Sequence, residues 1–187
     1  MGRLSTFEDR EIFAAVGAKL AGAGRMTFQT IVQETGVSVG SLYHRFESRE
    51  GLLARTWLDA VRAFQARFIS ELGSGGDDAG ERAALATPRF CRDDQARAIV
   101  LSCCRSSEFV SDATPEALRE EVHEVNDAAT LAVRRYAKQT GFSLEALRFG
   151  LVAFPLGAVR LYLPQQAVPK AVDSYVAAAF WSAVREK

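Results

Sequence analysis

Apolar residues recur every three or four positions along almost the whole chain, and no segment sustains the strict alternation of a half-buried strand. This period indicates an all-α protein. The pattern predicts nine helices: one that carries Ile12 to Leu20, one opening at Thr27, one at Ser38, one from Ser48 to Leu72, and five more over 80–92, 94–104, 115–140, 143–163 and 168–185. The glycine-rich stretch over residues 73–80 is the clearest loop.

Hydroxyl residues precede the first four predicted helices. Their side chains can accept a hydrogen bond from the free N–H groups of a helix start, so they are expected as N-caps. The candidates are Ser5 or Thr6, then Thr27, Ser38 and Ser48. Gly36 is expected to end the second helix with a positive φ, which glycine adopts without strain.

The predicted helix over 143–163 is apolar on nearly all sides, and the helix after it is rich in aromatic and small apolar residues. A helix that is apolar all round must be covered all round. We therefore expect a homodimer through these two helices, and the alternative is that both lie at the centre of a monomeric bundle. The candidate interface residues are Leu147, Leu151, Ala158, Tyr175, Ala179 and Phe180.

Composition and charge narrow the function only slightly. The chain has 187 residues, of which 48% are hydrophobic, so it can bury a sizeable core. Its formal net charge is zero, and residues 1–56 hold seven Lys and Arg against six Asp and Glu. Any surface that binds nucleic acid must therefore come from local placement of cations rather than from bulk charge.

Several classes of protein are disfavoured. The three cysteines form no CxxC pair and the N-terminus does not resemble a secretion signal, which favours the cytoplasm. The most apolar stretch, residues 149–159, is too short to cross a membrane. The familiar catalytic motifs are missing, and no second ligand cluster supports His123 and Asp127 as a metal site. We expect no enzyme activity, no metal and no cofactor.

The two short helices around Gly36 have the proportions of a helix-turn-helix, a motif whose second helix enters the major groove of DNA. Leu42 and Phe46 lie four residues apart and are expected to face inward. This turns a face of small groups and hydrogen-bond donors outward. Val39 and Gly40 permit close approach to base edges, and the side chains beyond them can reach phosphate oxygens.

The start of the fourth helix offers a second contact. Its free amides carry the positive end of the helix dipole, so a phosphate can bind there. The candidate DNA-binding residues are Thr27, Gln29, Ser38, Val39, Gly40, Ser41, Tyr43, His44, Arg45, Ser48 and Arg49.

The segment "MTFQTIVQETGVSVGSLYHRFESREGLL", residues 26–53, resembles the DNA-binding signature of the TetR family of transcriptional regulators. The resemblance implies a DNA-binding head over residues 1–50 and a ligand-binding and dimerisation domain over 51–187. It also implies a homodimer on a double-stranded DNA operator, most often a repressor released by a small-molecule effector. The sequence departs from the common pattern at Val32, at Val39, where a Lys is frequent, and at Gly51, which we expect to interrupt the first turn of the fourth helix.

The effector site is less defined by the sequence. The candidate pocket residues are Trp57, Phe64, Phe90, Cys103, Phe109, Phe149 and Phe154. Each of these also fits an ordinary core position. Pro155 removes an amide from its helix and is expected to bend it or to free a carbonyl toward a cavity. Two alternatives stay open: a thiol-based regulator that uses Cys103 and Cys104, and a head that binds a protein instead of DNA.

Overall fold

The computed structural model describes residues 8–185, and every regular element in this part of the chain is helical. The elements are α1 (Asp9–Ala23), α2 (Phe28–Thr35), α3 (Val39–Phe46), α4 (Arg49–Gly73), α5 (Ala79–Asp93), α6 (Gln95–Cys103), the 3-10 turn η1 (Ser106–Glu108), α7 (Glu116–Thr140), α8 (Leu144–Arg148), the π-helical turn η2 (Phe149–Ala153), α9 (Phe154–Arg160) and α10 (Val172–Arg185). Because α8, η2 and α9 follow one another without a break, residues 144–160 form one rod. Within the described residues the fold thus has the nine helices that the sequence predicts.

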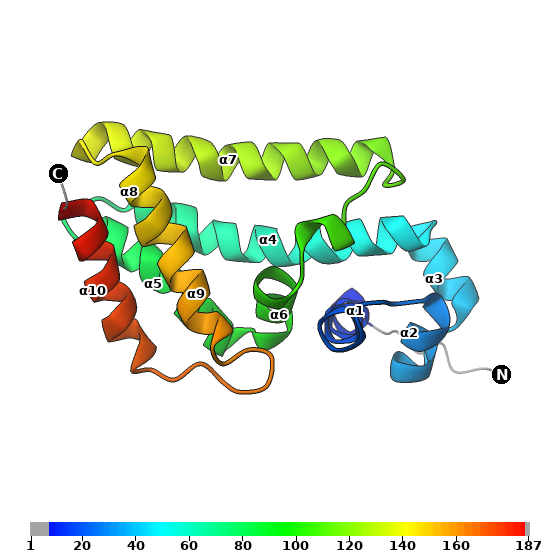
Figure 1. Cartoon of the computed structure of the whole chain (residues 1–187). Coiled ribbons are helices and arrows are strands. Elements are labelled where there is room, and N and C mark those ends of the chain that lie inside the picture. The colour runs from blue at the N-terminus through cyan, green and yellow to red at the C-terminus, as the bar shows by residue number, and fades with distance from the viewer. Residues whose placement is uncertain (1–7, 186–187) are drawn as a thin grey trace.

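The long helix α4 runs through the middle of the molecule (Figure 1). Helices α1, α2 and α3 gather at one end of it, and α8, α9 and α10 at the other. Helix α7 runs beside α4 and packs against it, as does α5. Helix α4 is therefore the element that joins the two ends.

Helices α2, α3 and α4 begin at the predicted hydroxyl residues. The three capping bonds run from Thr30 N–H to Thr27 Oγ1 (3.2 Å), from Ser41 N–H to Ser38 Oγ (3.1 Å) and from Gly51 N–H to Ser48 Oγ (2.9 Å). Gly36 has φ 75° and ends α2, which confirms its predicted role. The residue that precedes α1 is Glu8, while Ser5 and Thr6 lie outside the described residues.

The joint between α3 and α4 is a tight turn. Glu47 has φ 65° and ψ −47°, and the Ser48 N–H donates to Phe46 O at 2.7 Å, which makes Glu47 the centre of a γ-turn. The turn directs Phe46 O at Gly51, where a Cβ would lie only 2.2 Å from that oxygen. The expectation that Gly51 interrupts α4 is wrong: α4 passes through it unbroken, and the missing side chain makes room for the turn.

The buried side chains form two clusters. The first joins the three head helices to the start of α4 and includes Leu53 and Trp57, together with Leu118 of α7. The second surrounds the far half of α4, including Phe68, and contains Phe180 of α10. Helix α4 thus contributes to both cores, so a tilt of this helix repacks both.

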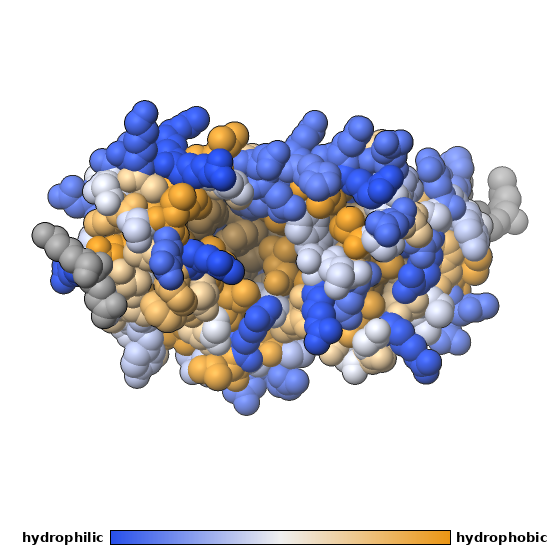
Figure 2. All heavy atoms as spheres, turned by 45° about the horizontal axis from the view of Figure 1, so that its top comes forward, coloured by the Kyte–Doolittle hydropathy of each residue, from blue (hydrophilic) through white to orange (hydrophobic). Residues whose placement is uncertain are grey.

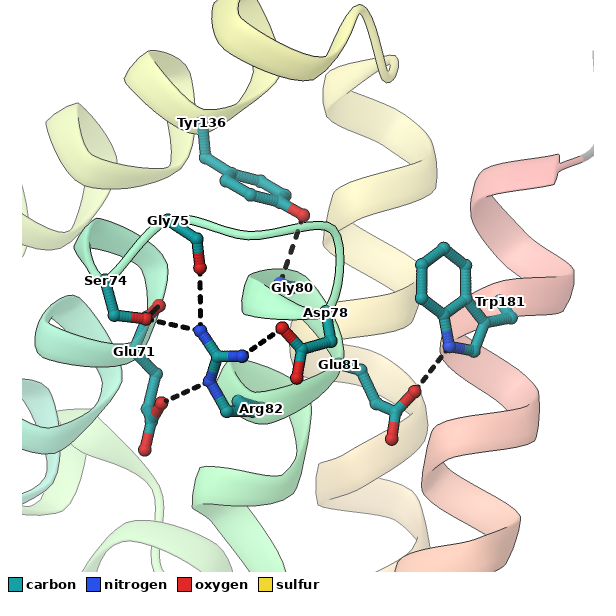
Figure 3. Close-up of polar contacts among 9 residues, drawn as sticks. All are labelled: Glu71, Ser74, Gly75, Asp78, Gly80, Glu81, Arg82, Tyr136 and Trp181. Atoms are coloured by element: carbon teal, nitrogen blue, oxygen red, sulfur yellow. Dashed lines mark hydrogen bonds and ion pairs between the residues drawn. The ribbon is translucent and has the colours of Figure 1, made fainter.

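The loop after α4 is held by one arginine (Figure 3). The Arg82 guanidinium of α5 donates to Glu71 Oε2 (3.0 Å), Ser74 Oγ (2.5 Å) and Gly75 O (2.8 Å), and it also pairs with Asp78. The hydrogen bond from Arg82 lowers the pKa of Asp78 below its usual range. These contacts fix the turn from α4 into α5.

The start of α5 is tied to two distant helices (Figure 3). The Gly80 N–H donates to the Tyr136 hydroxyl of α7 at 3.0 Å, and Trp181 Nε1 of α10 donates to Glu81 Oε2 at 2.5 Å. A Cβ on Gly80 would lie 2.3 Å from the Phe180 ring. Residue 80 must therefore be glycine for the Phe180 ring of α10 and the Tyr136 hydroxyl of α7 to approach α5 this closely.

The rod over 144–160 changes its winding before Pro155. The Phe154 N–H donates to Phe149 O, five residues back, so the chain makes a π-helical turn over Phe149–Ala153. Proline has no N–H to continue the α-helical ladder, and such a turn is one way for a helix to accommodate it. The structure thus accommodates Pro155 with the π-turn η2, while the bend or the freed carbonyl stays a prediction.

Candidate nucleic-acid interface and effector cavity

The outer face of α3 carries the groups that the sequence predicts there. Leu42 and Phe46 are 0% and 3% exposed, whereas Val39 and Tyr43 are 41% and 55% exposed. Gly40 has open space where a Cβ would lie. This face is exposed and sterically small near its start, which suits contact with a DNA groove.

The position of α3 on α2 is fixed by an aromatic pair. The ring of Tyr43 meets that of Phe28 edge to face, with centroids 4.8 Å apart. Thr27 and Gln29, at the start of α2, are both exposed beside this pair. Loss of the Tyr43 hydroxyl alone would leave the ring contact in place.

Two of the predicted phosphate contacts already have partners inside the head. Arg45 pairs with Asp9 of α1, and its guanidinium lies 5.7 Å from the centroid of the Phe46 ring. Arg49 donates from Nε to Met26 O at 3.1 Å and pairs with Glu50. Both arginines therefore stabilise the head itself, a role that the sequence did not indicate because the partners of Arg45 Nη2 and Arg49 Nε are distant in the chain.

A cavity of about 780 Å³ lies in the other half of the molecule, within the range of pockets that hold small molecules. Its walls come from α4, α5, α6, α7 and the rod over 144–160. Figure 2 shows it as a hydrophobic hollow beside a strongly hydrophilic rim. Its apolar walls include Phe64, Phe68, Phe90, Leu101, Leu147 and Leu151, and its polar groups include Gln65, Thr87, Ser102, Thr130, Arg134 and Arg148.

The structure brings only two of the predicted pocket residues to this cavity. Phe64 and Phe90 line it, with ring centroids 5.6 Å apart. The others lie outside its walls: Trp57 and Phe109 belong to the core at the head, Cys103 is half-buried nearby, and Phe149 and Phe154 are 46% and 42% exposed. One face of the rod lines the cavity through Leu144, Leu147 and Leu151, and the two phenylalanines lie on other faces.

The predicted interface residues fall into two groups, one buried and one at least partly exposed. Leu147, Leu151 and Phe180 are 0%, 1% and 0% exposed, so they pack inside the protomer and cannot meet a partner. Ala158 and Ala179 are half-buried, and Tyr175 is 73% exposed. The sequence did not separate the two groups because both apolar sets repeat at helical spacing. The large apolar side chains left exposed on this half include Phe149, Val152, Phe154 and Leu161.

The cysteines are not in the state that thiol chemistry needs. Burial raises the pKa of Cys91 to about 11 and that of Cys104 to about 12, and it also raises the pKa of Cys103. All three are therefore protonated at neutral pH, whereas the thiolate is the reactive form. These pKa values disfavour the thiol-based regulator.

Residues 8–185 lack two further features. This part of the chain holds no group of three or more His, Cys, Asp or Glu residues placed to bind a metal. Across the same residues, no helix has both the length and the apolar character needed to span a membrane.

The family described as "Bacterial regulatory proteins, tetR family" has a sequence model that matches residues 13–56, from α1 through the γ-turn into α4. Residues 13–56 therefore form a DNA-binding segment of the TetR type. The match identifies a DNA-binding head in this chain. In sequence, no curated protein matches it significantly.

Solved structures of several regulators share the whole fold. PfmR from Thermus thermophilus has 19% identity and a TM-score of 0.70, over 96% of this chain and 97% of that one. A regulator from Marinobacter aquaeolei has 16% identity and a TM-score of 0.72, over 94% and 95%. The fatty acid degradation regulator FadR from Bacillus halodurans has 15% identity and a TM-score of 0.66, over 96% and 100%. At these identities the likeness shows the fold alone.

Proposed function

We propose that the protein is a homodimeric repressor that a small molecule releases from its DNA operator. The observation that carries this proposal is the course of α4. Its first turn is fixed to α3 by the γ-turn and the Ser48 cap, and its middle supplies Val61, Phe64, Gln65 and Phe68 to the cavity wall. A molecule in the cavity therefore touches the same rigid element that holds the DNA-reading helix.

On the DNA side, α3 enters the major groove with Val39, Gly40 and Ser41 toward the bases. Tyr43 and His44 lie one turn further on and reach the phosphates. Thr27, Gln29, Ser38, Ser48 and Arg49 border the groove at the starts of α2, α3 and α4, where amide groups can hold a phosphate. The head comprises residues 1–50 and the ligand-binding and dimerisation domain residues 51–187. Such a regulator works in the cytoplasm, where bacterial DNA lies.

The dimer forms through exposed apolar side chains of the rod, of Leu161 directly after it, and of α10. Phe149, Phe154, Leu161 and Tyr175 are between 42% and 82% exposed, more apolar surface than isolated side chains account for. Two heads on one dimer then read half-sites about one helical turn, roughly 34–36 Å, apart.

Release by an effector requires a difference in affinity. A ligand lowers DNA affinity only if it binds the DNA-free arrangement of the heads more tightly, and each tenfold effect corresponds to about 1.4 kcal/mol. Because α4 belongs to both cores, a small tilt at the cavity changes the spacing of the two heads.

The test measures fluorescence anisotropy of labelled DNA from the region upstream of the gene. We expect binding with a steep loss of affinity as salt rises, because phosphate contacts release counterions. Tyr43→Phe should weaken binding about tenfold, the effect of one lost phosphate hydrogen bond of roughly 1.4 kcal/mol.

The matched control is Tyr162→Phe, which removes from the body a tyrosine hydroxyl that makes no hydrogen bond within residues 8–185. It should leave DNA affinity unchanged. Weak, salt-insensitive binding to every DNA tested would overturn the proposal and favour a head that recognises a protein.

A further inference from the structure

The charged side chains in the cavity lining are all positive. The lining contains two arginines, Arg134 of α7 and Arg148 of α8, and neither aspartate nor glutamate. The side chain of neither arginine makes a hydrogen bond or ion pair within residues 8–185, whereas nine other arginines in this range form ion pairs. Two unbalanced cations therefore border one apolar space.

The two arginines are exposed members of the cavity lining, whereas Phe68 and Phe90 are buried members of it. Arg134 and Arg148 are exposed, as are Leu144 and Val152 beside Arg148 on the same rod. Phe90, by contrast, is 5% exposed. Figure 2 shows the resulting arrangement, a hydrophobic hollow with strongly hydrophilic residues at its edge.

We infer that the effector is an amphipathic anion, with an apolar body in the cavity and an acidic head group at Arg134 and Arg148. The inference rests on the proposed function, because it names the ligand class of that same site. Guanidinium groups bind carboxylates and phosphates through charge-assisted hydrogen bonds. An ammonium head group would meet two like charges and no acid, and a neutral head group would gain no charge pairing.

Isothermal titration of the full chain without DNA tests the ligand class. The probes are decanoate, decyl phosphate, decanol and decylamine, which share a ten-carbon chain and differ in the head group. Each is used below the concentration at which it forms micelles. We expect at least one anion to bind tenfold or more tightly than decanol, and decylamine to bind more weakly than decanol. The better of the two anions identifies the head group as carboxylate or phosphate.

A double variant tests the two arginines. Arg134→Gln with Arg148→Gln should weaken binding of the preferred anion at least tenfold and leave decanol binding unchanged. Arg135→Gln is the matched control, because Arg135 is exposed on the same helix, outside the cavity lining. It should bind the anion as the unaltered protein does. Circular dichroism establishes that all three proteins keep their helix content.

Three results would overturn the inference: no binding of either anion, decanol binding as tightly as the anions, or anion binding that survives the double variant. None of them bears on the operator, because the titration contains no DNA. Failure of the regulator proposal would be seen separately, as anion binding through the two arginines in a protein that binds no upstream DNA.

Discussion

The starts of α4 in the head and of α5 in the body are capped in different ways. In the head, Ser48 caps α4 by accepting the N–H of Gly51, three residues away. In the body, the side chain of Asp78 makes no capping bond, and the Gly80 N–H of α5 donates instead to Tyr136, 56 residues away. The start of α4 is thus capped by a bond within one helical turn, and the start of α5 by a bond between segments that are distant in the chain.

This difference determines what a change of residue does. A local cap stabilises one helix wherever that helix packs, whereas a distant cap forms only after α5 and α7 have come together. The start of α5 should therefore depend more strongly than that of α4 on a side chain from a distant helix. Three substitutions, taken in order of expected effect, test that distinction.

Leu147→Ala should have the largest effect. Leu147 is 0% exposed and packs in the second core, so truncation removes buried contacts and leaves a cavity, at a cost of about 3 kcal/mol in the free energy of unfolding. Leu131→Ala, at a position 58% exposed on α7, is the matched control and should change stability by less than about 0.5 kcal/mol. Urea unfolding at one fixed protomer concentration measures both. Equal effects would mean that Leu147 is not held inside the protomer.

The placement of Leu147 marks the limit of sequence reasoning for this fold. The spacing of apolar residues alone predicted the helices and their order, and side-chain chemistry predicted Thr27, Ser38 and Ser48 as N-caps. Both signals lie within a few residues of one another in the chain. A helix that is apolar on several sides does not reveal which side meets its own protomer. Leu147, expected at an interface, therefore lies in the core, while Phe149, expected in the pocket, is 46% exposed.

The cavity was less predictable for the same reason. Its walls come from five segments, and the spacing along each helix shows only which residues share a face. Phe64 and Phe90 were predicted to line it, but Arg134 and Arg148 were not, since a cation on an amphipathic helix is ordinarily a solvated one. Only the folded structure shows that Arg134 and Arg148 border one apolar cavity whose lining contains no acidic residue.

Gly51→Ala should have the second largest effect and is confined to the head. The new Cβ would meet Phe46 O, a backbone atom of the γ-turn that cannot move without shifting α3. We expect a loss of about 2 kcal/mol, in the range of overpacked sites, despite the better helix propensity of alanine. Gly40→Ala is the matched control: its Cβ would enter open space on α3, so stability should rise slightly. If Gly51→Ala also stabilised the protein, the α3–α4 joint would be looser than described.

Tyr136→Phe should have the smallest effect, and it tests the distant cap directly. The substitution keeps the buried ring and removes only the oxygen that accepts the Gly80 N–H at 3.0 Å. That amide is then left in the interior without a partner, which costs about 1–2 kcal/mol. Tyr162→Phe is the control, because no hydrogen bond of the Tyr162 hydroxyl is present in residues 8–185, and it should be nearly neutral. If the two variants unfold at the same urea concentration, water hydrogen-bonds the Gly80 N–H in the variant, and the start of α5 does not depend on Tyr136.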